Sequence, residues 1–201
     1  DIIQCLQADK QMLVMIAQNP GQRVPGYWEP FEIAVRAIVG QQISVKSATT
    51  LMGKIANTYG QQTDLGRVFP NANDLSQIDV TQLSMPVKRA QAIKDMSQAV
   101  VDGSVDFTFG SDPANLMHQL ENIKGIGLWT AQYIAMRALG DPDAFLEGDL
   151  VLVKVAKRRL GIKCNRELIE RSKQWQPFRA YASMHLWRQA AQLNDVSKNK
   201  G

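Results

Sequence analysis

Apolar side chains recur along most of the chain at the spacing of an amphipathic α-helix. Between residues 31 and 39, apolar positions fall at i, i+3, i+4 and i+7, starting at Phe31 and ending at Ile38, which places them on one helical face. The same pattern predicts further helices over residues 44–59, 86–101, 114–121, 128–139, 150–160 and 179–193. The chain is therefore predicted to be all-α.

Strand signals are weak by comparison. Only residues 104–109 alternate as a strand would, and glycines bound this short stretch on both sides. The polar and glycine-containing segments at residues 19–29, 60–73, 103–112 and 140–148 are interpreted as loops between helices. The polar tail, residues 195–201, is expected to fray.

Composition narrows the possible chemistry. The chain has 201 residues, of which 45% are hydrophobic, and a formal charge of +4, which permits a nucleic-acid partner without requiring one. Two cysteines, Cys5 and Cys164, cannot build a multi-cysteine zinc site or a four-cysteine iron–sulfur cluster. Two histidines, His118 and His185, lack metal-binding spacing. We therefore expect no metal and no cofactor, and the absence of a long apolar run predicts no membrane association.

A glycine pair stands between two predicted helices. Gly125 and Gly127 flank Ile126, so the chain can reverse tightly there, and the missing Cβ atoms allow another molecule to approach the backbone. The free N–H groups at the beginning of the next helix would suit a phosphate oxygen, while Ile126 would hold the turn in the core. The alternative is a plain helical connection without a ligand, because Gly-x-Gly is common.

A carboxylate follows at the beginning of another predicted helix. Asp149 comes directly after Gly148, and an N-cap alone would explain an aspartate there. The functional alternative is a carboxylate aimed into a cleft. The two roles are compatible, because a capping residue can present its other oxygen to a ligand.

Taken together, the glycine turn at residues 125–127 and Asp149 at the beginning of a later predicted helix resemble the helix–hairpin–helix DNA glycosylase superfamily. The resemblance is closest to the 3-methyladenine DNA glycosylase II or AlkA type. Three further segments, at residues 31–45, 85–90 and 175–187, match the family in the order in which the family has them, so the resemblance covers residues 25–190. It implies a single, all-α glycosylase domain over residues 1–201, with two helical lobes, an active-site cleft between them and the helical hairpin at about residues 114–139.

The resemblance implies a monofunctional DNA glycosylase of base excision repair. Such an enzyme flips a nucleotide out of the duplex and hydrolyses the N-glycosidic bond of an alkylated purine, here 3-methyladenine or 7-methylguanine. Asp149 matches the family's catalytic aspartate, which stabilises the positive sugar that develops as the bond breaks. Trp129 stands where strand-cleaving branches carry a Schiff-base lysine, and an indole cannot form an imine.

Other functions remain open at this point. Hypoxanthine or etheno-adenine are alternative lesions for the same site. A non-catalytic helix–hairpin–helix module would only grip phosphates, a role that requires neither Asp149 nor a set of aromatic residues. A glycosylase that also cleaves the strand is disfavoured by Trp129.

The resemblance also assigns the remaining site residues. Trp129, Tyr133 and Trp187 match or adjoin positions that line the base pocket, where aromatic faces attract a cationic base, although an aromatic residue taken singly is more often a core residue. Trp28, in the loop before the first matched helix, is a further candidate for this pocket. Gln42 matches the residue that fills the gap left by the flipped nucleotide, or is simply polar at a helix turn. The remaining predicted DNA contacts are Lys88, Lys124, Gly125, Ile126, Gly127 and Thr130.

Positive charge is concentrated after Asp149. Residues 150–173 carry eight Lys and Arg against two Glu, whereas the rest of the chain is net negative. Such a segment suits a phosphate backbone and predicts salt-sensitive binding, unless it is only a solvated helix face. The expected partner is double-stranded DNA with damaged bases, bound by a monomer in the cytoplasm of a bacterium or archaeon or in a eukaryotic nucleus.

Overall fold

Helices account for most of the regular structure. The computed structural model describes residues 1–64, 66–108 and 110–198, with side chains described as far as residue 190. The chain forms two compact units: unit 1 comprises residues 1–25 and 140–201, and unit 2 comprises residues 26–139. The expectation of an all-α fold is confirmed, whereas the cleft that the resemblance implies between two lobes remains a prediction.

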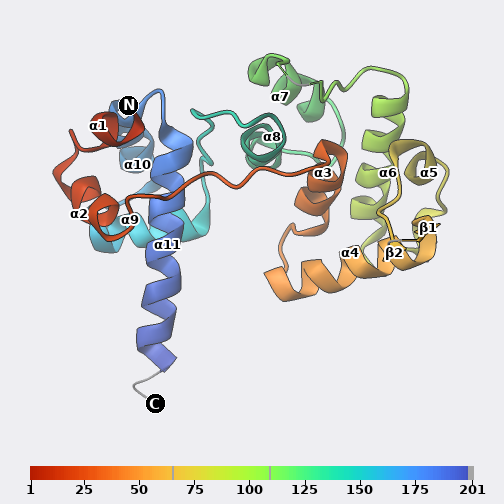
Figure 1. Ribbon diagram of the computed structural model, residues 1–201, viewed down its shortest axis with the longest axis horizontal. Coiled ribbons are helices and arrows are strands. Elements are labelled where there is room, and N and C mark those ends of the chain that lie inside the picture. Colours follow the sequence, from red (N-terminus) through yellow and green to blue (C-terminus); the bar gives the residue numbers. More distant parts are fainter. Residues whose placement is uncertain (65, 109, 199–201) are drawn as a thin grey trace. The chain divides into compact units, whose positions relative to one another are not determined.

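Unit 2 is built around the buried helix α3 (Pro30–Val39), which packs against α4, α6 and α8 (Figure 1). The Glu29 side chain accepts a hydrogen bond from the Phe31 N–H, and Pro30 occupies the first turn, so both residues favour a helix start here. The other elements are α4 (Val45–Tyr59), β1 (Gln62–Thr63), β2 (Gly66–Arg67), α5 (Ala72–Ser76), η1 (Val80–Gln82), α6 (Val87–Val101), α7 (Pro113–Glu121), α8 (Leu128–Ile134) and the π-helix η2 (Ala135–Leu139).

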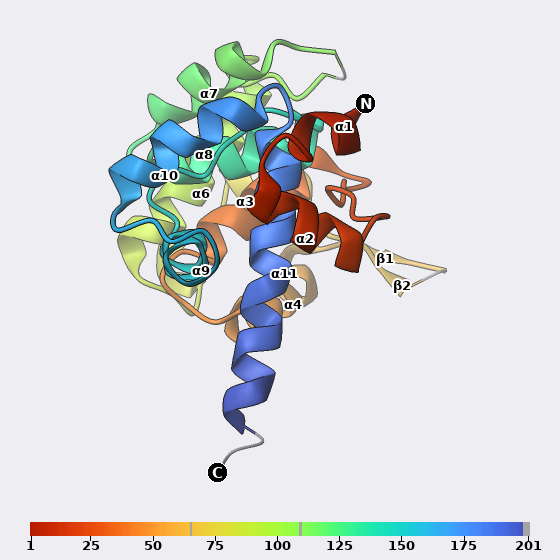
Figure 2. The same ribbon diagram turned by 90° about the vertical axis from the view of Figure 1, so that its left-hand side faces the viewer.

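Unit 1 joins both ends of the chain around helix α11 (Arg179–Lys198). Figure 2 shows α9 and α2 flanking α11, and both pack against it. The buried Asp9 caps α2 and also accepts hydrogen bonds from the Arg171 guanidinium and the Trp175 indole, which ties the first helices to the last third of the chain. The other elements are α1 (Ile2–Leu6), α2 (Lys10–Gln18), α9 (Leu150–Arg159), α10 (Asn165–Ser172) and η3 (Lys173–Trp175).

Most predicted helices are confirmed to within one or two residues, because each buries an amphipathic face. The predicted helix over residues 128–139 is α-helical to Ile134 and continues as a π-helix. Helices α1, α2, α5 and α10 were not predicted.

The weak strand signal at residues 104–109 does not produce a strand in the described residues, in keeping with the interpretation of residues 103–112 as a loop. Residues 104–108 form a bend and irregular chain, and Phe109 lies outside the described residues. A two-residue antiparallel pairing instead occupies residues 62–67, in a segment predicted to be a loop. Residues 195–198 of the polar tail continue α11, while residues 199–201 lie outside the described part, and fraying of the tail stays a prediction. No helix in the described ranges has the length and apolar character needed to span a bilayer.

Candidate active site

Asp149 lies at the N-terminus of α9, as the sequence predicts for a capping residue. Gly148 turns the chain with a φ of +78°, and its N–H donates to the Asn165 side chain at 3.3 Å. The Asp149 Oδ1 atom accepts the Leu152 N–H at 2.7 Å, which closes the first turn of α9. Because Phe145 and Leu146 before the turn are buried in the core, the loop that carries this carboxylate is anchored.

Trp187 contacts the same carboxylate oxygen from α11. Its indole N–H donates to Asp149 Oδ1 at 3.2 Å, and its side chain is half-buried. Two donors from two helices therefore orient the carboxylate. This contact gives Trp187 a defined role beside Asp149, while contact of its ring with a base stays a prediction.

The glycine pair in unit 2 joins α7 to α8 as expected. Gly125 has a φ of +98°, and a Cβ at this position would lie 3.1 Å from the Cβ of Ala92, so both conformation and space favour glycine. Ile126 is only 4% exposed and packs in the core, as predicted. Gly127 is exposed and begins α8 without a side-chain cap, and a Cβ there would meet no atom within 4 Å.

Gln41 holds this turn in place, a role that sequence reasoning missed. Its Nε2 donates to the Gly125 carbonyl at 3.0 Å and to the Thr130 hydroxyl at 3.1 Å. Thr130 is 4% exposed, so its side chain supports the hairpin from inside, while its contact with DNA stays a prediction. These partners lie 84 and 89 residues away from Gln41 in sequence, and no local pattern could have revealed them.

Three of the predicted DNA contacts of unit 2 have long polar side chains that are exposed. Gln42 has a φ of +59° in the turn between α3 and α4. Lys124 immediately precedes the hairpin glycine, and Lys88 lies in the first turn of α6, where its carbonyl oxygen would be 3.9 Å from a Cβ at Gly125. Gln42, Lys88 and Lys124 thus present their side chains to solvent, and their contact with DNA stays a prediction.

An aromatic pair lies on α8. Trp129 and Tyr133 are one turn apart and stack with ring centroids 5.4 Å apart and planes 13° from parallel. Both side chains are half-buried. Burial raises the pKa of the Tyr133 hydroxyl, an effect that the nearby Arg137 charge partly opposes, so the phenol remains neutral at physiological pH.

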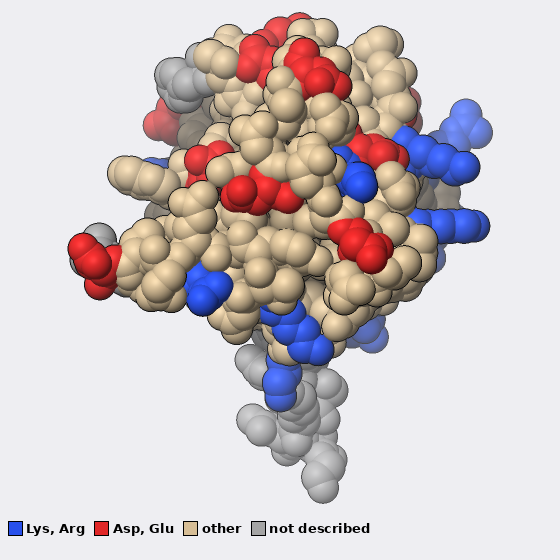
Figure 3. Space-filling view, turned by 90° about the vertical axis from the view of Figure 1, so that its right-hand side faces the viewer, with Lys and Arg blue, Asp and Glu red and all other residues tan. Residues whose placement is uncertain are grey.

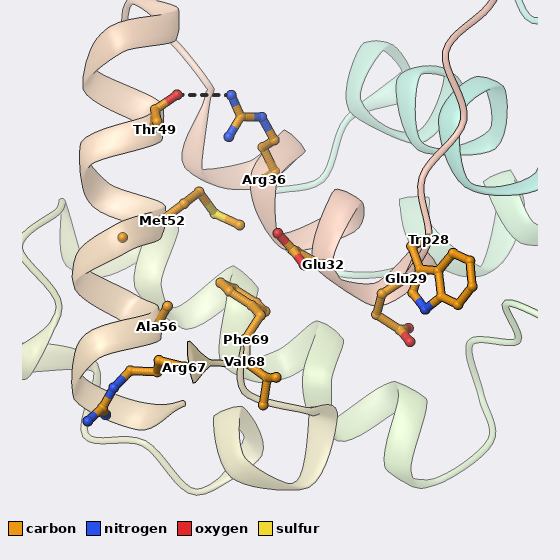
Figure 4. Close-up of a pocket in the computed structure, with 11 residues that line it drawn as sticks. Trp28, Glu29, Glu32, Arg36, Thr49, Met52, Ala56, Arg67, Val68 and Phe69 are labelled. Atoms are coloured by element: carbon orange, nitrogen blue, oxygen red, sulfur yellow. Dashed lines mark hydrogen bonds between the residues drawn. The ribbon is translucent and has the colours of Figure 1, made fainter. Parts of the chain in front are cut away.

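Trp28 borders a surface hollow and is not part of the aromatic pair on α8. Its side chain is fully exposed and borders a hollow of about 680 Å³ formed by α3, α4 and the chain after β2 (Figure 4). Glu32 and Met52 point into this hollow from the two helices. Burial raises the pKa of Glu32, although the nearby Arg36 charge acts in the opposite direction. Membership of Trp28 in a base pocket stays a prediction.

The basic segment after Asp149 is only partly available to a ligand. Arg171 is engaged by the buried Asp9, and Lys173 pairs with Glu170. The other basic side chains of the segment are exposed: Lys154, Lys157, Arg158, Arg159, Lys163 and Arg166. We call these six the basic surface of α9 and α10.

Charge differs between the two units. Unit 2 carries nine Lys and Arg against ten Asp and Glu, whereas unit 1 carries fourteen against nine. On the face of unit 2 that carries α4 and α5, side chains of both signs are interspersed (Figure 3). Among the described residues, no group of three or more His, Cys, Asp or Glu is arranged to hold a metal ion.

The sequence of residues 35–178 matches the family described as "HhH-GPD superfamily base excision DNA repair protein". The chain belongs to this superfamily. The HhH-GPD match includes the hairpin glycines, the aromatic pair and Asp149, while Trp28 and Trp187 lie outside it.

Curated relatives extend the comparison within the HhH-GPD superfamily. The chain is 38% identical over 192 residues to a Mycobacterium tuberculosis protein named "Probable bifunctional transcriptional activator/DNA repair enzyme AlkA", covering 92% of this chain and 38% of that one. It is 34% identical over 177 residues to Escherichia coli "DNA-3-methyladenine glycosylase 2", covering 85% of this chain and 61% of the relative. The chain thus spans less than two thirds of the length of these relatives.

A solved structure has a similar fold. A Schizosaccharomyces pombe 3-methyladenine DNA glycosylase, determined in complex with abasic DNA, aligns with a TM-score of 0.78 at 20% identity, covering 93% of this chain and 95% of its own. At this identity the likeness establishes the fold alone.

Proposed function

We propose that the chain is a DNA glycosylase of base excision repair that hydrolyses the N-glycosidic bond of alkylated purines, 3-methyladenine and 7-methylguanine foremost. The observation that carries the proposal is the Asp149 carboxylate, oriented by the Leu152 N–H and the Trp187 indole in a chain of the HhH-GPD superfamily. The name of the Escherichia coli relative, DNA-3-methyladenine glycosylase 2, supports 3-methyladenine as a substrate, and the name of the Mycobacterium tuberculosis relative supports DNA repair.

Asp149 stabilises the charge that develops during bond cleavage. As the bond between C1′ and the base nitrogen lengthens, its electron pair leaves with the base and the sugar becomes positive. A fixed carboxylate lowers the energy of this state because its orientation needs no reorganisation during the reaction. Water then adds to C1′ and loses a proton, which leaves an abasic site. A base alkylated at a ring nitrogen already carries positive charge and departs as a neutral molecule.

Base binding is assigned to the aromatic pair of α8. Trp129 and Tyr133 present a stacked, half-buried aromatic surface, on which a flipped purine can stack. An aromatic face attracts a cationic base by about 0.5–2 kcal/mol more than a neutral one. This surface is our proposed source of affinity for the lesion.

DNA binding is assigned to the hairpin, the turn after α3 and the basic surface. The exposed backbone at Gly125 and Gly127 and the side chains of Lys88 and Lys124 would contact phosphates. Gln42 would fill the gap that the flipped nucleotide leaves. The proposed substrate is double-stranded DNA, bound by one copy of the chain.

We further propose that the enzyme does not cleave the DNA strand. Strand cleavage through an imine requires an amine nucleophile, and the residue at position 129 is tryptophan. Borohydride reduction during the reaction should therefore trap no covalent complex with DNA. A trapped complex would contradict this part of the proposal.

The function is tested by incubating the chain with methylated duplex DNA and identifying the released bases. We expect free 3-methyladenine and 7-methylguanine, with strands that break only after alkali treatment. Duplexes with hypoxanthine or etheno-adenine serve as comparison substrates. Absence of any released base, with salt-sensitive duplex binding retained, would contradict the proposed activity and favour a binding module.

A further inference from the structure

A charged residue, Arg137, follows the aromatic pair one helical turn further along the chain. Trp129, Tyr133 and Arg137 follow one another at intervals of four residues along α8 and η2. Such spacing places successive side chains near one another along the helix surface. The last of the three lies in a π-helical turn, a feature that is frequent at functional sites.

Arg137 is held against aromatic rings. Its guanidinium carbon lies 5.5 Å from the ring centroids of both Tyr27 and Tyr133. Its Nη1 atom donates to the Tyr133 hydroxyl at 3.3 Å. The aromatic pair that we assign to the base therefore already has a cation beside it.

The charge of Arg137 is not neutralised by a carboxylate. Among the residues that the structure describes, Arg137 forms no salt bridge, and its buried Nε atom has no hydrogen-bond acceptor. The side chain is half-buried. A charge in such a place is screened less by water than one at the surface, so it acts on neighbouring groups over several ångströms.

We propose that Arg137 weakens the preference of the aromatic pair for cationic bases by opposing a second positive charge at Tyr133. A base alkylated at a ring nitrogen is positively charged. At the Tyr133 ring it would lie near the positive charge of Arg137, which already interacts with that ring. A purine modified without charge, such as hypoxanthine, would meet no such repulsion. Arg137 therefore extends the proposed substrate range from cationic alkylated purines toward neutral modified purines. This inference rests on the proposed function.

The test compares excision of one cationic and one neutral lesion under single-turnover conditions. Duplexes with 7-methylguanine or hypoxanthine in the same sequence context are offered to the wild type, Arg137→Met and Arg137→Lys. Methionine keeps an unbranched apolar stem and removes the charge, whereas lysine keeps the charge. Lys46→Gln, an exposed charge removal on α4, is the matched control.

We expect Arg137→Met to raise the ratio of 7-methylguanine to hypoxanthine excision by about tenfold. Arg137→Lys should stay near the wild-type ratio, and so should Lys46→Gln. Equal changes of both rates in Arg137→Met would overturn the inference, since a purely structural residue affects both lesions alike.

Poor folding of Arg137→Met does not remove the test. Arg137→Gln removes the same charge and keeps a polar end group, and it should raise the same ratio. The inference is overturned if neither neutral variant changes the ratio while the wild type releases both bases. A wild type that releases no base overturns the proposed function and, with it, this inference.

Discussion

The Asp9 carboxylate shows how one residue can hold two distant parts of the chain together. Its side chain is 2% exposed and forms an ion pair with Arg171 at 2.7 Å. It also accepts the Trp175 indole N–H at 3.0 Å and the Gln11 backbone N–H at 3.0 Å. Burial by itself raises the pKa of Asp9, but these donors outweigh burial and hold the pKa below its usual value.

Asp9→Asn should lower the free energy of unfolding by about 3 kcal/mol at pH 7, because the partly buried Arg171 charge loses its partner. Asparagine is as good an N-cap as aspartate, so α2 itself should be preserved. Urea unfolding at pH 7 measures the difference. An unchanged free energy of unfolding would show that this ion pair contributes no net stability.

The same variant gives a prediction for pH. The pKa of Asp9 is lowered on folding, so its contribution is present above the unfolded value of about 3.9 and is lost as the pH falls through the folded value. The stability difference between wild type and Asp9→Asn should therefore shrink below about pH 4. Urea unfolding repeated from pH 7 to pH 3 tests this. A constant difference would contradict the assigned pKa direction.

At the scale of elements, the two glycines of the hairpin should respond differently to substitution by alanine. Gly125→Ala should destabilise the fold by about 2 kcal/mol, because alanine would be strained at a φ of +98° and its Cβ would press on Ala92. Gly127→Ala should cost less than about 1 kcal/mol, since its Cβ would point into open space. Urea unfolding measures both variants.

The two variants also separate folding from binding. If the backbone at Gly127 approaches a phosphate, its added methyl group should weaken duplex binding while stability is preserved. Fluorescence anisotropy with a labelled duplex measures the affinity. Wild-type affinity in Gly127→Ala would argue against close approach of DNA at this position.

The basic surface of α9 and α10 is the second element with a testable role. Replacing Arg158 and Arg166 by glutamine should reduce the slope of log affinity against log salt by about 0.9 for each phosphate that the protein no longer neutralises. Replacing Lys46 and Lys54 on α4 removes as much charge from unit 2 and serves as the control. Equal slopes in both double variants would show that the basic surface is only a solvated helix face.

Helix prediction mostly succeeded where burial imposes a period, although α2 was missed despite burying Met12, Met15 and Ile16 at helical spacing. Helix α3 could be predicted because its apolar positions repeat along one face, whereas α10 buries only Leu168 and Ser172 and has too few apolar positions to show a period. The pairing of β1 with β2 is two residues long, which is below any detectable alternation.

Site prediction was limited by contacts between distant residues. A glycine turn and an N-terminal aspartate are local features, so Gly125 and Asp149 could be singled out from the sequence. The bonds of Gln41 to the hairpin and of Trp187 to Asp149 join residues far apart and require the folded chain. The spacing of Tyr133 and Arg137 was readable, whereas the contact of Arg137 with Tyr27 joins residues far apart in the sequence and also requires the folded chain.

At the scale of the whole molecule, the excess of positive charge and the proposed catalytic carboxylate belong to the same unit. Unit 1 carries the excess of positive charge together with Asp149, whereas unit 2 is close to neutral and carries the hairpin. Positive charge near the proposed reaction centre would draw the phosphate backbone toward it. The proposed function therefore depends most on the chemical role of Asp149.

The most direct test is the single-turnover rate of 3-methyladenine release by Asp149→Asn compared with the wild type. Asparagine keeps the N-cap of α9 and removes only the negative charge, so folding and duplex affinity should be unchanged. We predict a rate at least about 100-fold below that of the wild type. A rate close to the wild-type value would contradict the assignment of Asp149 as the group that stabilises the developing positive charge.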